Sequence, residues 1–219
     1  MTSTKPSRIA VTTFTTQFRK QVHQLIAWGF KDAKTRVNSN DEHEPAITGF
    51  IAEATNDRFC ALDCTKWFSY YSVHDNSPVK KEGRSGKSRP IPDIIIEAGF
   101  KGRPKYLFEA KRLRKAGFPV SKYTASDGIG CFISGLYASE YNESGMLGYV
   151  QSDSMEHWQN DVKSAIDKDS TELRLKSPQR DVRIIEAFPL EWVSEHERDG
   201  VPRPIIIFHI LLDCRTNLG

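Results

Sequence analysis

The sequence predicts an α/β protein in which helices flank a central mixed β-sheet. Segments with helical and extended patterns follow one another along the 219 residues in the order helix, helix, strands, helix, strand, helix, strands. Two runs rich in β-branched and aromatic residues, 91–100 and 106–113, are separated by a short polar break and are typical of a hairpin. A third run, 204–214, is apolar enough to lie in the middle of a sheet.

The N-terminal part of the chain is expected to contribute two helices. After residues 1–10, which are polar and expected to be flexible, apolar residues recur at helical spacing over 15–33. Asp41 can cap a second helix that continues to about Ala54. On that helix Glu44 shares the apolar stripe, so its side chain is expected to face inward.

Further elements are expected on both sides of the hairpin. The aromatic-rich segment 60–73 is strand-like, and 74–90 is a polar, basic loop. A helix is expected over roughly 128–141 and a short strand over 146–151.

The C-terminal third is expected to form one more helix and two more strands. Ser154 is a suitable N-cap for a helix over 155–168, and the strands are expected at 181–193 and 204–214. The sequence has no internal repeat and no low-complexity linker, so we expect residues 1–219 to form one domain.

Alternation of side chains along the hairpin is expected to bring three charged residues together. Asp93 lies at the start of the first strand, and Glu109 and Lys111 share one face of the second. If the turn is centred near Lys101, Asp93 lies opposite Glu109. Two carboxylates about 4 Å apart repel by about 4 kcal/mol at an effective dielectric constant near 20, so a divalent cation is expected to compensate.

Magnesium fits such a carboxylate pair. This ion takes one or two carboxylates and completes its shell with water and phosphate oxygens, as phosphodiester cleavage requires. Lys111 is expected on the same face, where it could orient or deprotonate the attacking water and stabilise the charge of the transition state. The alternative is an ordinary charged strand edge that faces water.

The order of these residues resembles a known signature. Pro92-Asp93, followed sixteen positions later by Glu109-Ala110-Lys111 in an apolar β context, is similar to the motif of the PD-(D/E)XK nuclease superfamily. The resemblance covers about residues 40–150 and implies a restriction-endonuclease-like core.

The resemblance also implies roles for individual residues. Asp93 and Glu109 would bind the metal, with help from the backbone carbonyl of Ala110, and Lys111 would be the catalytic lysine. Glu44 matches a further acid that many members carry on the preceding helix, with Glu42 as the second choice. For Glu44 the alternative is an acid that complements the helix dipole.

The implied activity is that of an endodeoxyribonuclease that hydrolyses phosphodiester bonds through a metal-activated water. The expected cofactor is Mg²⁺, for which Mn²⁺ can substitute, and the expected setting is bacterial or phage-related DNA defence or processing. Cutting both strands would require a homodimer or a partner subunit that supplies specificity. A same-fold exonuclease, junction resolvase or RNA nuclease remains open, as does a non-catalytic nucleic-acid-binding subunit.

Positive charge is concentrated around the proposed motif. The chain carries a net charge of only +3, but residues 80–115 hold twelve Lys or Arg against four acids. Contacts with DNA phosphates are expected from five of them, with an ordinary charged face as the alternative. These five are Arg112, Arg114, Lys115, Lys87 and Arg89, and Tyr123 and Ser126 are further candidates just beyond the second hairpin strand.

Other classes of function lack support in the sequence. Cys60 and Cys64 have no second pair to complete a zinc site, and no serine-hydrolase elbow or phosphate-binding loop is present. No apolar run approaches the roughly 20 residues of a membrane span. We therefore expect a cytoplasmic protein with reduced thiols.

Overall fold

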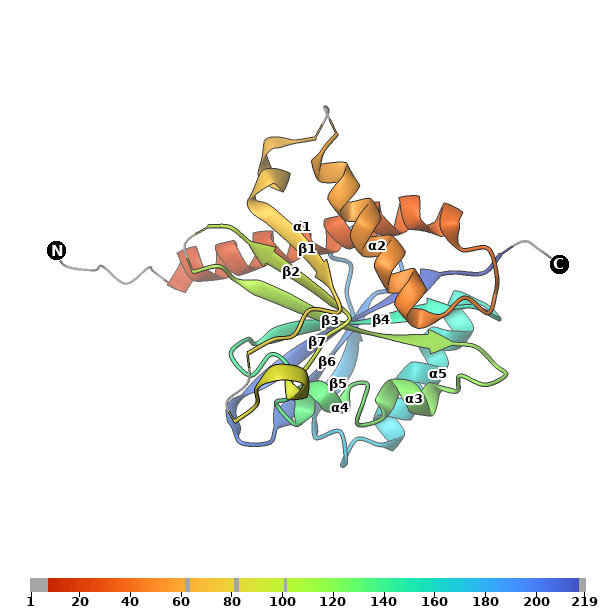
Figure 1. Ribbon diagram of the computed structural model, residues 1–219. Helices are drawn as coiled ribbons and strands as arrows, with labels where there is room; N and C mark the ends of the chain where they lie inside the picture. The colour runs from red at the N-terminus through yellow and green to blue at the C-terminus, as the bar shows by residue number, and fades with distance from the viewer. Residues whose placement is uncertain (1–7, 62–63, 81–82, 101, 217–219) are drawn as a thin grey trace.

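The computed structural model describes residues 8–61, 64–80, 83–100 and 102–216 (Figure 1). The first helix, α1 (Arg8–Ala33), begins within residues 1–10, whose expected flexibility stays a prediction. The rest of that stretch, and Lys101 in the expected hairpin turn, lie outside the described residues.

The described residues form a seven-stranded mixed sheet, which confirms the α/β prediction. Its strand order is β1-β2-β3-β4-β7-β6-β5. The centre is parallel, because β3, β4 and β7 run in one direction, and the neighbours on both sides pair antiparallel. The strands are β1 (Tyr71–Asp75), β2 (Ile94–Ala98), β3 (Lys105–Leu113), β4 (Glu143–Val150), β5 (Leu175–Asp181), β6 (Trp192–Arg198) and β7 (Val201–Asp213).

Helices cover both faces of the sheet (Figure 1). On one face, α1 and α2 (Glu44–Phe59) pack with the side chains of Phe108 and neighbouring strand residues. On the other face, α3 (Val120–Thr124), α4 (Gly130–Ile133) and α5 (Met155–Lys168) cover Leu107 and its neighbours. Three 3₁₀ helices complete the helical segments described, at Lys34–Arg36, Lys66–Tyr70 and Gly86–Ser88.

The hairpin has the register expected from the sequence. Ile94 lies opposite Phe108 and Ile95 opposite Leu107, and one more step in this register places Asp93 opposite Glu109. The apolar run in β7 lies between β4 and β6, as expected of an interior strand. At α5, the Ser154 side chain accepts a hydrogen bond from the His157 N–H, which confirms the predicted cap.

Two helix predictions are wrong in their bounds. The second helix begins at Glu44 after His43 and has no side-chain cap; the Asp41 carboxylate instead pairs with two arginines. The helix expected over 128–141 is reduced to α4, because Gly135 adopts a φ of 63° and ends the helix in the left-handed conformation.

Three strand predictions also need correction. The segment 181–193 is mainly the loop between β5 and β6, where Ile185 and Phe188 pack into the core without pairing as a strand. The strand-like stretch 60–73 contains a 3₁₀ helix before β1, and its residues 62–63 lie outside the described part. The strand expected over 146–151 starts earlier, at Glu143.

Candidate active site

The start of β2 and the middle of β3 bring the predicted site residues together. Asp93 directly precedes β2, and Glu109 and Lys111 belong to β3. Because side chains alternate along a strand, Glu109 and Lys111 share the face on which Leu107 packs, the face covered by α3, α4 and α5. The three residues therefore form one cluster on this face of the sheet.

Asp93 is fixed by the backbone of the neighbouring strand. Its Oδ2 accepts a hydrogen bond of 2.7 Å from the Ala110 N–H, so the carboxyl group lies beside the peptide between the other two site residues. Burial raises the pKa of Asp93, while the bond from Ala110, the charge of Lys111 and the interaction with Glu109 act in the opposite direction. The charge of Asp93 also raises the pKa of Glu109, so the two carboxyl groups interact electrostatically.

Glu109 is the most constrained acid of the cluster. Its side chain is 8% exposed, and its Oε1 accepts from Lys111 Nζ at 2.8 Å. Its Oε2 is buried and accepts no hydrogen bond from any residue that the structure describes. Burial first, and then the charge of Asp93, raises the pKa of Glu109 to about 8. A buried carboxylate oxygen with no partner is the kind of atom that a cation would satisfy.

Lys111 lies between two acids. Its Nζ is 2.8 Å from Glu109 Oε1 and 3.6 Å from Glu44 Oε1. Burial acts to lower the pKa of Lys111, but the two carboxylates raise it above the usual range. The ammonium group therefore stays charged at neutral pH, which favours an electrostatic role over removal of a proton from water.

Glu44 reaches the cluster from the first residue of α2. Its Oε2 accepts from the Arg112 N–H at 3.1 Å, next to the contact of Oε1 with Lys111. Burial raises the pKa of Glu44, and Lys111 opposes that shift. Glu42, the second choice from the sequence, instead turns its Oε1 toward the His43 N–H at 3.3 Å.

The cluster can be tested against the needs of a divalent cation. Within the described part of the chain, no three His, Cys, Asp or Glu side chains stand close enough together to form a ready metal site. Magnesium, however, needs only one or two carboxylates, because water and substrate oxygens complete its shell. Asp93 and Glu109 meet that need, because Glu109 Oε2 has no hydrogen-bond partner among the described residues. The Ala110 carbonyl, which the resemblance implies as a further ligand, belongs to the residue between Glu109 and Lys111 in β3.

The predicted DNA contacts divide into exposed and buried residues. Lys115, Lys87, Arg89 and Ser126 are exposed, and the Arg114 side chain is 26% exposed and pairs with Asp41. Two predictions are contradicted by burial. The Arg112 side chain is 4% exposed and bonds to the protein itself, and Tyr123 is fully buried with its hydroxyl on His209 Nδ1 at 3.0 Å.

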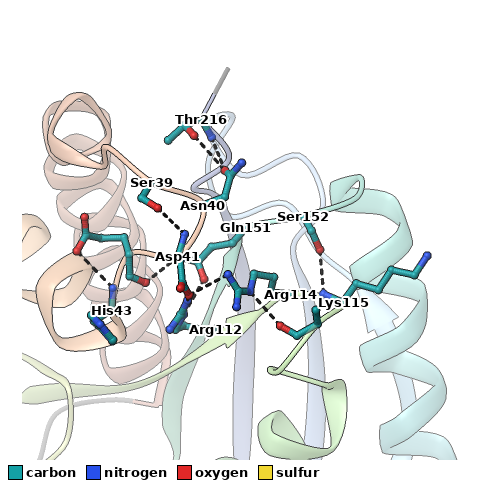
Figure 2. A network of polar contacts seen from close by, with 12 residues as sticks. Ser39, Asn40, Asp41, His43, Arg112, Arg114, Lys115, Gln151, Ser152 and Thr216 are labelled. Atoms are coloured by element: carbon teal, nitrogen blue, oxygen red, sulfur yellow. Dashed lines mark hydrogen bonds and ion pairs between the residues drawn. The ribbon is translucent and has the colours of Figure 1, made fainter. Parts of the chain in front are cut away.

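Two polar residues around the site were not anticipated from the sequence. Gln151, which follows β4, bonds to both Arg112 and the Glu42 carbonyl (Figure 2). The Tyr137 hydroxyl donates to the Ile91 carbonyl at 2.9 Å and so holds the segment that leads to Asp93. Neither residue lies in the motif, and only the position of Gln151 at the end of an apolar strand gives a signal.

Comparison of the chain with models of protein families, with curated proteins and with solved structures finds no significant match. None of the helices formed by the described residues is both long enough and apolar enough to span a bilayer. The case for a function therefore rests on the geometry of the Asp93, Glu109, Lys111 and Glu44 cluster.

Proposed function

We propose that this protein is a magnesium-dependent endodeoxyribonuclease with a restriction-endonuclease-like core, of the PD-(D/E)XK kind. The observation that carries the proposal is the register of the β2–β3 hairpin. It sets Asp93 opposite Glu109, with Lys111 on the same face and a buried Glu109 oxygen that has no hydrogen-bond donor among the described residues. The order α2, hairpin, α3 and α4, β4 agrees with the order that the resemblance implies for 40–150.

Each residue of the cluster has a role suited to phosphodiester hydrolysis. Asp93 and Glu109, with the Ala110 carbonyl and Glu44, would hold the ion. When bound, Mg²⁺ would neutralise charge on the scissile phosphate and lower the pKa of a water molecule. Lys111 keeps its positive charge beside these acids and would stabilise the negative charge that develops on the phosphate.

The proposed substrate is DNA, held by exposed cations near the hairpin. Lys115, Lys87 and Arg89 are exposed and free to meet a phosphate backbone, whereas Arg112 is not. A homodimer or a partner subunit would supply the second active site or the sequence specificity. Binding of nucleic acid alone would require only the exposed cations, and not a buried pair of acids beside a lysine.

The test is cleavage of supercoiled and linear DNA with Mg²⁺, with Mn²⁺ and with EDTA. The variants are Asp93→Asn and Lys111→Ala, and Glu97→Gln is the matched control. Glu97 is also a buried acid of the hairpin that pairs with a lysine, since Lys105 Nζ lies 3.0 Å from its Oε2.

Metal-dependent cutting that Asp93→Asn and Lys111→Ala abolish and Glu97→Gln retains would support the proposal. Cutting that persists in Asp93→Asn and Lys111→Ala would show that the site is wrong. Circular, linear and branched DNA, together with RNA, would then separate the endonuclease from the exonuclease, resolvase and RNA nuclease of the same fold. The folded state of each variant is checked by circular dichroism.

A further inference from the structure

Three polar contacts connect the segment that leads into α2 with β3 and with the end of β4, and Figure 2 shows those made by the Arg112 and Gln151 side chains. Asp41 Oδ1 accepts from Arg112 Nη2 at 2.5 Å, and the Glu42 carbonyl accepts from Gln151 Nε2 at 2.8 Å. The third point is the Glu44 carboxylate on the Arg112 N–H at 3.1 Å. Arg112 and Gln151, which are far from residues 41–44 in the sequence, thus contact the segment in which α2 begins.

Arg112 is the centre of these contacts. Its guanidinium is buried, donates through Nε to Gln151 Oε1 at 2.7 Å and lies 3.8 Å from the centre of the Phe118 ring. A buried arginine keeps its charge and needs such partners, and its planar fork can serve two acceptors at once. The donors that meet Asp41 and Gln151 are therefore not free for a DNA phosphate.

Among the described residues no side chain caps the start of α2, whose first turn contains Pro45 and whose Ile47 is buried in the core. The hydrogen bond of 2.9 Å between Thr48 Oγ1 and the Tyr149 hydroxyl anchors the helix to β4 one turn further on. Glu44, the first helical residue, closely follows Asp41 and Glu42, which the Arg112 and Gln151 side chains contact, and its Oε1 lies 3.6 Å from Lys111 Nζ.

We propose that Arg112 and Gln151 are positioning residues, which act as a clamp on 41–44 and hold Glu44 at the metal site. This inference rests on the proposed function, in which Glu44 takes part in binding the ion. Neither residue touches the substrate. Loss of the clamp would leave Asp93 and Glu109 in place but allow Glu44 to move away, which would weaken the affinity for the metal.

The test measures metal binding to the DNA-free protein by calorimetry with Mn²⁺ and Mg²⁺, besides cleavage. The variants are Arg112→Lys, Gln151→Leu, Glu44→Gln and the double variant of Arg112 and Glu44. Arg19→Lys is the matched control. Arg19 also pairs through Nε and Nη2, with Glu143 at the other end of β4, and its guanidinium lies 4.8 Å from the centre of the Phe208 ring.

We expect Arg112→Lys and Gln151→Leu each to weaken the affinity for the metal by about 10- to 100-fold, as Glu44→Gln does, because supporting residues of metal sites have effects of this size. The double variant should bind no more weakly than Glu44→Gln alone, because Arg112 acts through Glu44. Higher metal concentrations should restore much of the cleavage by Arg112→Lys. Arg19→Lys should bind metal like the wild type.

Other outcomes separate the clamp from the proposed function. Normal metal affinity in Arg112→Lys and Gln151→Leu, with loss in Glu44→Gln, would refute the clamp and leave the nuclease proposal intact. Additive losses in the double variant, or weaker DNA binding with unchanged metal affinity, would also refute it. No metal binding by the wild type would overturn the proposed metal site, and the clamp with it.

Discussion

Binding of magnesium should release a proton from Glu109. Burial and the charge of Asp93 raise the pKa of this carboxyl group to about 8 in the metal-free protein. At pH 7 a group with this pKa is protonated in about nine of ten molecules, and a metal ligand has to be deprotonated. We therefore expect release of about 0.9 proton per ion at pH 7 and about 0.1 at pH 9.

The same linkage sets the pH dependence of the affinity. Below pH 8 the apparent affinity for Mg²⁺ should fall by about tenfold per pH unit, and above pH 8 it should become constant. Calorimetric titrations in two buffers with different enthalpies of ionisation measure both the affinity and the number of protons released. In the metal-free protein Asp93→Asn should lower the pKa of Glu109, measured by NMR of its carboxyl group, because it removes a charge that raises this pKa.

Glu97→Gln serves as the control, since it alters a buried acid of the same hairpin outside the site. A proton release near zero at pH 7, or an affinity that stays constant from pH 6 to 8, would refute the reasoning. Either result would mean that Glu109 is already ionised before the metal arrives, or that it is not a ligand.

Three further predictions concern stability, measured by urea unfolding. Without metal, Glu109→Gln should stabilise the fold at pH 9 by up to about 5 kcal/mol, because the raised pKa of Glu109 means that folding opposes its ionisation above pH 4.5. Burial lowers the pKa of His196 and His209 below 6.5, so stability should fall below pH 6.5 by up to about 2.7 kcal/mol per pH unit, as the unfolded chain binds two more protons. Gly145→Ala should destabilise the fold by about 1 to 3 kcal/mol. A β-carbon there would lie 2.2 Å from the Phe108 ring.

The two histidines belong to a buried chain of hydrogen bonds whose direction follows from one carbonyl. The Leu173 carbonyl can only accept, so His196 Nδ1 carries the hydrogen at 2.6 Å and the neutral His196 Nε2 accepts from Ser194. Ser194 Oγ then accepts from His209 Nε2 at 2.7 Å, and His209 Nδ1 accepts from the Tyr123 hydroxyl. Protonation of either imidazole ring would disrupt this order of donors and acceptors. The Tyr123 hydroxyl donates one of these hydrogen bonds, to His209 Nδ1.

The sequence predicted the β2–β3 hairpin correctly, because the spacing of residues decides its register. The hairpin register follows from period-two alternation, and it correctly placed Asp93 opposite Glu109. The same alternation puts Arg112 on the opposite face from Lys111, so its burial among the residues near α2 could have been expected. Its position in a basic run suggested a surface residue instead.

Other elements depended on contacts that local patterns do not contain. β5 alternates polar residues at the edge of the sheet and carries no apolar signal, so it was missed. The apolar residues of 181–193 have the pattern of a strand, but Ile185 and Phe188 pack into the core from a loop. Gln151 could not be identified as a partner of the 41–44 segment, because the contact spans 109 positions in the chain.

The hairpin itself contains a comparison that argues for a cation at the proposed site. Glu97 lies at one end of it with two basic partners, Arg103 and Lys105, and these lower its pKa despite partial burial, which acts to raise it. At the other end three acids share one lysine, and burial together with Asp93 raises the pKa of Glu109. Basic side chains of the hairpin compensate the negative charge of Glu97, whereas the acids of the cluster have only Lys111 to compensate theirs. A fold that keeps an uncompensated acid cluster in its interior gives up stability there, and a bound divalent cation is the partner that would restore the balance of charge.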